Sequence, residues 1–130
     1  MHAPASQRRI DRPSAAIALF APLARAREEI AAFAYLDARW RLLGMRHAMG
    51  LRPDSADIPM RAVVGDALAF DARAVVMAHN HPGGDPTPTP ADRDATRQLA
   101  QLLGALDIRL VDHLVLARGG VASLRALGLL

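Results

Sequence analysis

The pattern of apolar and polar positions predicts two strands in the second half of the chain. Residues 74–78 (AVVMA) form a short, continuous apolar run, which is typical of a strand buried on both faces. Residues 109–117 (RLVDHLVLA) are predicted to form a second strand. A turn at Gly119-Gly120 and a short C-terminal tail follow it.

Three segments are predicted to be helical. Ser14 suits the N-cap of a short helix that runs to about Ala21 and ends near Pro22. Residues 59–70 show a helical pattern with a proline suited to the first turn. The strongest helix opens at residues 89–92 and continues to about residue 106. Its apolar face is expected to consist of Leu99, Leu102, Leu103 and Leu106.

Residues 28–45 (EEIAAFAYLDARWRLLGM) allow two interpretations. Their alanine, leucine, glutamate and arginine content favours a helix, whereas the aromatic residues and short apolar runs suit two strands. We expect a loop over residues 50–57 and a flexible N-terminal arm over residues 1–13. Residues 14–130 then form one domain of the α/β (α+β) class, in which helices sandwich a mixed β-sheet.

Composition limits the chemistry that the chain can carry. Among its 130 residues there is no cysteine, which excludes disulfides, thiolate zinc sites and cysteine nucleophiles. A metal site would therefore have to use histidines and carboxylates. All 16 basic residues are arginine and the net charge is only +3. The cluster of Arg8, Arg9 and Arg12 in the arm is interpreted as a solvated tail.

The N-terminal region has the outline of a signal peptide, with an apolar stretch after two arginines. Asp11 and Pro13 before that stretch and Pro22 inside it argue against export. No run reaches the ~20 apolar residues of a membrane span. A cytoplasmic protein is therefore expected.

The residues with most chemical potential lie in HNHPGGDPTPTPADRD, residues 79–94, directly after the first predicted strand. On a strand the side chains of His79 and His81 point to the same side, so two imidazoles can converge on one ion. A catalytic zinc needs a third protein ligand, and Asp92 can supply it from the first turn of the following helix. Asp85 and Asp94 are the alternative third ligands.

Two observations leave the metal site open on spacing alone. A lone H-x-H is a weak motif, and Thr89-x-x-Asp92 also matches a helix capping box. Other histidine motifs do not fit. The residues of the HNH nucleases are dispersed rather than adjacent, zinc deaminases need cysteines, and the helical H-E-x-x-H motif is absent.

Two stretches, HNHPGGDPTPTPADRDATRQL and LGALDIRLVDHLVLARGGVASL, resemble the RadC family of bacterial JAB/MPN (JAMM) domains. The family pattern is H-x-H-P, a short loop and S-x-x-D, with ten residues between the second His and the Asp, and His79, His81 and Asp92 meet it. The family also carries an upstream Glu in E-x-F-x-x-x-x-L-D. EIAAFAYLD matches this segment in length and places that Glu at Glu29.

The sequence departs from the family pattern at several positions. The Ser of S-x-x-D is Thr89, which keeps a hydroxyl, and the usual H-P-S-G reads HPGG, with Gly83 in place of Ser. Ala31 stands where a Phe is expected two residues after the Glu. The helix-hairpin-helix region of full-length RadC proteins has no counterpart in this sequence. The metal-binding positions are therefore retained while the surrounding positions differ.

The resemblance implies a catalytic zinc site. His79, His81 and Asp92 would hold Zn²⁺, Glu29 would act as the general base, and the Thr89 hydroxyl would stabilise the oxyanion. Glu28 is the competing base, although it would face the opposite way on a strand.

The neighbouring Asp112 and His113 recur in the family's L-D-H-L stretch, which implies a structural or supporting role rather than ligation.

The function predicted on this basis is that of a zinc-dependent metallopeptidase that cleaves a peptide or isopeptide bond in a protein or peptide substrate. Two alternatives stay open. One is a RadC-like module associated with DNA repair or nucleic-acid binding, although no basic stripe supports it. The other is a non-catalytic MPN scaffold for protein interactions.

Overall fold

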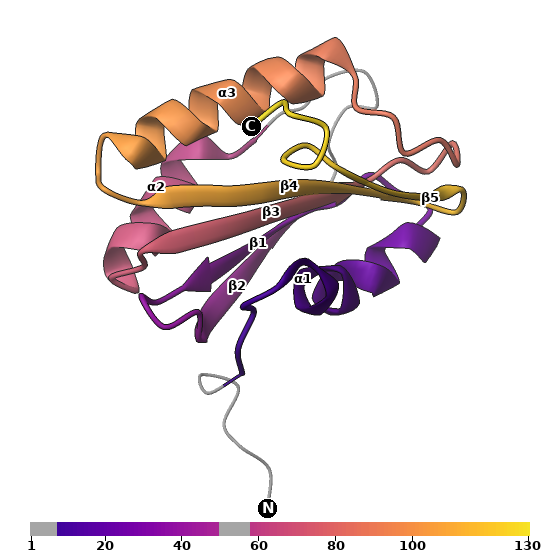
Figure 1. Ribbon diagram of the computed structural model, residues 1–130. Coiled ribbons are helices and arrows are strands. Elements are labelled where there is room, and N and C mark those ends of the chain that lie inside the picture. The colour runs from indigo at the N-terminus through magenta and orange to yellow at the C-terminus, as the bar shows by residue number, and fades with distance from the viewer. Residues whose placement is uncertain (1–7, 50–57) are drawn as a thin grey trace, which may run out of the picture.

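The computed structural model describes residues 8–49 and 58–130, and it shows one five-stranded sheet with helices on both faces (Figure 1). The strand order is β2-β1-β3-β4-β5. The strands are β1 (Ala31–Leu36), β2 (Leu42–Ala48), β3 (Ala74–Asn80), β4 (Arg109–Ala117) and β5 (Gly120–Ser123). The helices are α1 (Pro13–Phe20), the 3₁₀ helix η2 (Ala21–Arg25), α2 (Met60–Ala69) and α3 (Pro90–Gly104). The predicted class, a mixed sheet sandwiched by helices, is confirmed.

The central pair of strands, β3 and β4, is parallel, and every other neighbouring pair is antiparallel. A parallel pair needs a crossover connection, which α3 provides between the end of β3 and the start of β4. The carboxyl ends of the two central strands therefore lie side by side, and the loop from β3 to α3 starts at that edge of the sheet.

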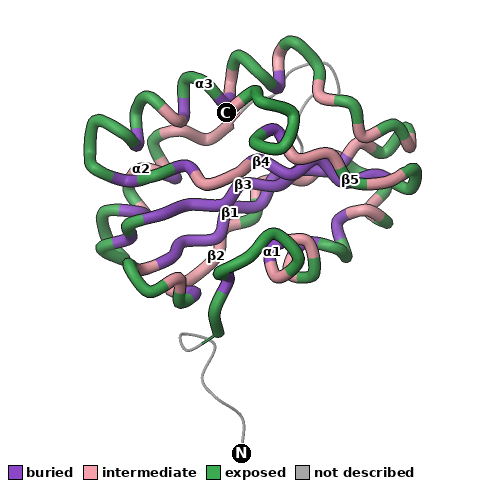
Figure 2. Tube along the Cα trace, in the orientation of Figure 1, coloured by how far each residue is buried: buried purple, intermediate pink, exposed green. Residues whose placement is uncertain are grey.

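The sheet separates two apolar cores. One core lies under α1 and η2 and includes Phe20, Leu36 and Leu116. The other lies under α2 and α3 and includes Phe33, Met77 and Leu99. Buried residues run along the central strands and along the inner sides of the helices (Figure 2). Because β1 and β3 are covered on both faces, they consist of uninterrupted apolar residues up to the polar end of β3.

The ambiguous segment over residues 28–45 forms strands rather than a helix. All six residues of β1 are buried, with Phe33 and Tyr35 in one core and Leu36 in the other. The chain turns back to β2 through Asp37, whose Oδ1 accepts hydrogen bonds from the backbone N–H groups of Arg39 and Arg41. The interpretation as two strands is thus correct.

A polar network ties β1 and β2 to α2. The buried Tyr35 hydroxyl donates to Asp66 Oδ2 at 2.8 Å, and Arg46 donates to both oxygens of the same carboxylate. Burial and the hydrogen bond to Asp66 raise the pKa of Tyr35 far above its usual value. The hydrogen bond from Arg46 leads the causes that lower the pKa of Asp66. One carboxylate in α2 thus binds side chains from both β1 and β2.

Several predicted boundaries are corrected by packing. Part of the expected flexible arm is packed on the domain, because Leu42 N–H donates to the carbonyl of Arg8 and Ile10 is only 3% exposed, within the α1-side core. Helix α1 begins at Pro13 instead of following a Ser14 cap. In α3, Leu99 and Leu103 are buried as predicted. Leu102 and Leu106, expected on the same face, are exposed by 46% and 42%.

Other predicted elements agree with the structure or lie outside the described residues. The helix predicted over residues 59–70 is α2, and the strand over residues 109–117 is β4. The loop expected over residues 50–57 lies outside the described residues, as do residues 1–7. Within the described part of the chain, no helix is long and apolar enough to cross a bilayer.

Candidate metal centre

The two histidines of the HNH stretch lie where β3 leaves the sheet. Side chains alternate along a strand, so His79 shares the α2/α3 face with Val75 and Met77. His81 follows β3 directly, and its N–H still donates to the carbonyl of Leu116 in β4. Both imidazoles are therefore presented at the sheet edge opposite the start of α3.

Asp92 meets these histidines from the first turn of α3. His79 Nε2 lies 2.9 Å from His81 Nε2 and 3.3 Å from Asp92 Oδ1. His81 Nε2 in turn lies 3.1 Å from Asp92 Oδ2. The side chains of His79 and Asp92 are each 4% exposed and that of His81 is 14% exposed. Two ring nitrogens and one carboxylate thus converge in a largely buried place.

Glu29 approaches the same point from the segment that precedes β1. Ligand atoms of Glu29, His79 and His81 all lie within 4.8 Å of one another. The Glu29 residue is half-buried, whereas its neighbour Glu28 is exposed. Of the two adjacent glutamates that the sequence offers, the structure brings Glu29 to the histidines.

The middle residue of the HNH stretch, Asn80, holds the backbone that carries Glu29. Its Oδ1 accepts a hydrogen bond from Ile30 N–H at 2.7 Å, and its Nδ2 donates to the carbonyls of Glu28 at 2.8 Å and Ala26 at 3.2 Å. The side chain is fully buried on the α1 side of the sheet. No local pattern in the sequence indicates this role, because the partners of Asn80 lie about fifty positions earlier in the chain.

The alternative third ligands are directed elsewhere. The Asp85 carboxylate accepts hydrogen bonds from the N–H and hydroxyl of Thr87, and its backbone carbonyl, not its side chain, lies 2.9 Å from His81 Nδ1. Asp94 is exposed and pairs with Arg97 at 3.5 Å. Among the three aspartates, only the Asp92 carboxylate reaches His79 and His81.

The capping box at the start of α3 is also present. Asp92 N–H donates to Thr89 Oγ1, and Thr89 N–H donates to Asp92 Oδ2. The two interpretations of Thr89-x-x-Asp92 are therefore compatible, since one carboxylate both caps the helix and faces the histidines. Thr89 itself is exposed beside this cluster.

The titratable groups of the site shift one another's pKa values. Burial would raise the pKa of Asp92, but its contacts with His79 and His81 outweigh burial and lower the pKa far below its usual value. The hydrogen bond to Asp92 leads the causes that raise the pKa of His81. Burial leads those that lower the pKa of His113, a ring fully enclosed behind His79. Asp92 therefore stays ionised, and His113 stays neutral.

The donor set fits a divalent metal ion. A carbonyl only accepts hydrogen bonds, so the contact with Asp85 requires a proton on His81 Nδ1, and Nε2 of the neutral ring is then a bare lone pair. That lone pair faces His79 Nε2 and the carboxylate of Asp92. Such groups repel one another unless a cation lies between them, and two imidazoles with a carboxylate are typical zinc ligands.

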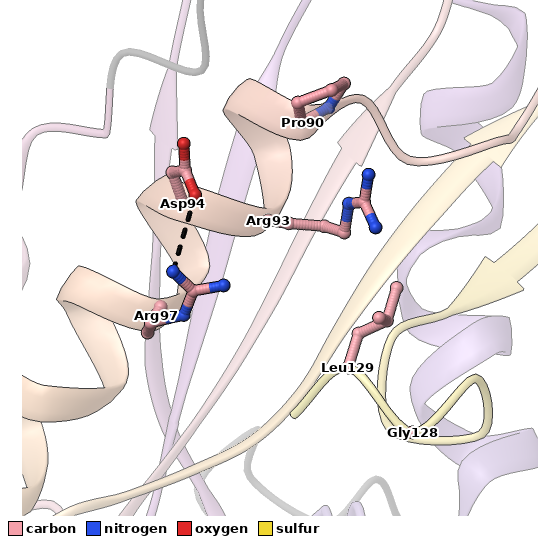
Figure 3. Close-up of a pocket in the computed structure, with 6 residues that line it drawn as sticks. All are labelled: Pro90, Arg93, Asp94, Arg97, Gly128 and Leu129. Atoms are coloured by element: carbon pink, nitrogen blue, oxygen red, sulfur yellow. Dashed lines mark ion pairs between the residues drawn. The ribbon is translucent and has the colours of Figure 1, made fainter.

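A separate surface groove runs beside the start of α3. It has a volume of about 430 Å³ and is lined by Pro90, Arg93, Asp94, Arg97, Gly128 and Leu129. The arginine side chains extend from α3 on the side of the C-terminal segment (Figure 3). None of His79, His81 and Asp92 lines this groove, so it is distinct from the histidine cluster.

Comparison with known proteins identifies the family. Residues 10–129 match the model of the RadC-like JAB domain. A UPF0758 protein of Xanthomonas campestris pv. campestris is 43% identical over 117 residues, which cover 89% of this chain and 52% of that protein. A UPF0758 protein of Vibrio cholerae serotype O1 is 40% identical over 100 residues, covering 77% of this chain and 63% of the relative.

The chain thus spans about half to two thirds of the length of these curated relatives. Their names state no activity. The match nevertheless extends across both apolar cores, the HNH stretch and the start of α3. On that extent and identity, the chain belongs to the RadC-like JAB domain family.

Proposed function

We propose that the domain is a zinc-dependent hydrolase that cleaves peptide or isopeptide bonds. The observation that carries the proposal is the convergence of Glu29, His79 and His81 within 4.8 Å, with Asp92 in contact with both imidazoles. His79, His81 and Asp92 would hold the ion. A bound zinc ion supplies Lewis acidity, which makes water a nucleophile near neutral pH and polarises a carbonyl group.

Glu29 is the general base in this proposal. Its carboxylate lies close enough to the histidine cluster to accept a proton from a water molecule there and to pass it to the leaving amine. Asn80 serves this step indirectly, because its three hydrogen bonds fix the backbone on both sides of Glu29. A glutamate on a pinned segment loses little entropy in reaching its reactive position.

Thr89 is assigned to the oxyanion. In the capping box its oxygen accepts a hydrogen bond from Asp92 N–H, so its own proton is not consumed there and can be donated outward. The residue is exposed at the mouth of the cluster, where the carbonyl of a peptide substrate can approach. This donation would stabilise the negative charge that develops on the carbonyl oxygen.

The experiment compares two adjacent glutamates. Zinc-loaded wild-type protein is incubated with a panel of peptide and isopeptide substrates, alongside Glu29→Gln and the matched control Glu28→Gln. We expect Glu29→Gln to lose about 10²- to 10⁴-fold in rate while zinc content stays the same, and Glu28→Gln to keep its activity.

An active Glu29→Gln variant, or zinc-loaded wild-type protein that cleaves no member of the panel, would contradict the proposal. The second outcome would favour a zinc-binding module without hydrolytic activity. Steeply salt-dependent DNA binding would then distinguish the nucleic-acid alternative from the protein scaffold.

A further inference from the structure

A line of buried hydrogen bonds leads from α3 through β4 to the metal centre. Thr96 Oγ1 lies 2.6 Å from the backbone carbonyl of Asp92 and 2.5 Å from His113 Nδ1. His113 Nε2 lies 2.6 Å from His79 Nδ1. Thr96 is 1% exposed, His113 0% and His79 3%, so water does not compete for these contacts. His79 Nε2, at the end of the line, faces His81 and Asp92.

With neutral rings, two arrangements of protons give a donor and an acceptor to both contacts of His113. The Thr96 hydroxyl has a single proton, which it donates either to the Asp92 carbonyl or to His113 Nδ1. In the first case His113 Nδ1 must carry a proton and donate to the hydroxyl oxygen. His113 Nε2 is then an acceptor, and the proton of His79 lies on Nδ1. In the second case the hydroxyl donates to His113 Nδ1 and His113 Nε2 donates to His79 Nδ1, while no proton is left for the contact between the hydroxyl and the Asp92 carbonyl.

The two arrangements have opposite consequences for the metal centre. The first leaves His79 Nε2 as a lone pair, which can bind a metal ion. The second places a proton on His79 Nε2, directed at the histidine and carboxylate cluster, and so prevents ligation. The Thr96 hydroxyl donates to the Asp92 carbonyl in the structure, at 2.6 Å, which corresponds to the first arrangement.

We propose that Thr96 and His113 are positioning residues that hold His79 in the tautomer whose Nε2 is free to bind the metal. For His81 the backbone carbonyl of Asp85 does the same directly, because it accepts a hydrogen bond from Nδ1 and so keeps the proton away from Nε2. At His79 the group that contacts Nδ1 is the ring of His113 instead of a carbonyl, and the proton position of His113 depends in turn on Thr96. Hydrogen-bond partners of this kind fix the orientation and basicity of metal-binding histidines. This inference rests on the proposed metal-binding function.

The direct test is ¹⁵N-detected NMR of histidine side chains in the zinc-loaded wild-type protein. We expect His113 and His79 each to carry their proton on Nδ1, with His113 Nε2 and His79 Nε2 unprotonated. A proton on His113 Nε2 would overturn the proposal, because His79 would then receive its hydrogen bond rather than donate one.

The second test measures zinc affinity by competition with a chelator. Thr96→Val keeps the shape of the buried side chain but leaves the His113 Nδ1 proton without an acceptor. Thr96→Ser retains the hydroxyl. We expect about a 10- to 100-fold weaker zinc affinity for Thr96→Val and recovery to near wild type in Thr96→Ser. Unchanged affinity in a folded Thr96→Val variant would overturn the proposal.

These readouts separate the inference from the proposed hydrolysis, since neither involves a substrate. Protein that binds zinc with the expected tautomers but cleaves nothing would overturn only the hydrolytic function. Protein that cleaves its substrate with His113 protonated on Nε2 would overturn only this inference. Failure of the wild-type protein to bind zinc would overturn both.

Discussion

Two polar clusters occupy opposite ends of the same face of the sheet. At one end Tyr35, Arg46 and Asp66 join β1, β2 and α2. At the other end, where Ala31 of β1 pairs with His79 of β3, the histidines meet Asp92. Both clusters bring together side chains from distant parts of the chain, and both contain strongly perturbed titratable groups. They differ in how donors and acceptors are matched.

In the tyrosine cluster the Tyr35 hydroxyl and two guanidinium nitrogens of Arg46 donate to Asp66, so a cation faces a carboxylate anion. The cluster is complete without any added group. In the histidine cluster the carboxylate of Asp92 and the ring nitrogens of His79 and His81 face one another. Excess acceptors of this kind require an added cation or proton. The balance of donors and acceptors therefore distinguishes a cluster that only stabilises the fold from a cluster suited to bind a cation.

The largest effect that this comparison predicts is on zinc binding. Removing the carboxylate in Asp92→Ala takes away one of the three proposed ligands, and we expect zinc affinity to fall at least about 100-fold. The matched control is Asp94→Ala, two residues along the same helix, which should keep full zinc content. Elemental analysis after dialysis measures both. Equal zinc content in the two variants would show that Asp92 is not a ligand.

A smaller effect is expected from the residue that positions Glu29. Asn80→Ala removes three hydrogen bonds to the segment over residues 26–30 while leaving the ligands intact. We expect hydrolysis to fall about 10²-fold, because misplacement of a catalytic group is costly, with zinc content retained. Rate measurements on zinc-loaded protein would check this. Loss of zinc in parallel with activity would instead indicate a general collapse of the site.

The tyrosine cluster should affect stability but not zinc affinity. Tyr35→Phe removes one hydrogen bond and should lower the free energy of unfolding by about 1 kcal/mol. Asp66→Ala leaves the buried Tyr35 hydroxyl without this acceptor and should cost about 1–3 kcal/mol. Denaturant unfolding and chelator competition on the same samples measure both quantities. A change in zinc affinity in either variant would break the distinction between the two clusters.

The smallest effect concerns the pH dependence of stability. The pKa of Asp66 is lowered in the folded protein, led by its hydrogen bond from Arg46, so its ionised form stabilises the fold. That contribution is complete above the unfolded value of about 4 and is lost as pH falls through the folded pKa. The difference in stability between wild type and Asp66→Asn should therefore shrink below about pH 4. A constant difference across this range would exclude the carboxylate charge as its cause.

Sequence reasoning succeeded where neighbours in the chain determine the structure. The positions of β3, β4 and α3, and the shared direction of His79 and His81, follow from local periodicity. It left β1 ambiguous because a strand buried on both faces shows no alternation, and its alanines also favour a helix. The helical pattern predicted Leu102 and Leu106 in the core, but the sheet covers only a narrower stripe of α3, which contains Leu99 and Leu103.

The site was predictable in part for the same reason. His79, His81 and Asp92 lie in one short stretch, so their spacing could indicate a metal site. The positions of Glu29, Asn80 and His113 depend on strand pairing and on contacts between residues 34 to 54 positions apart. Only the resemblance to a family identified Glu29, and no local signal indicated that Asn80 or Thr96 supports the site.

The capping box links the proposed metal centre to the opening of the first turn of α3. Asp92 both closes the first turn of α3 and faces the histidines, so a bound ion would hold that turn closed. Each opening of the turn would have to withdraw a ligand. Amide hydrogens of Thr89 and Asp92, both donors in the box, should then exchange with solvent more slowly when the ion is present. The exchange rate of these two amide hydrogens would therefore show whether an ion occupies the site.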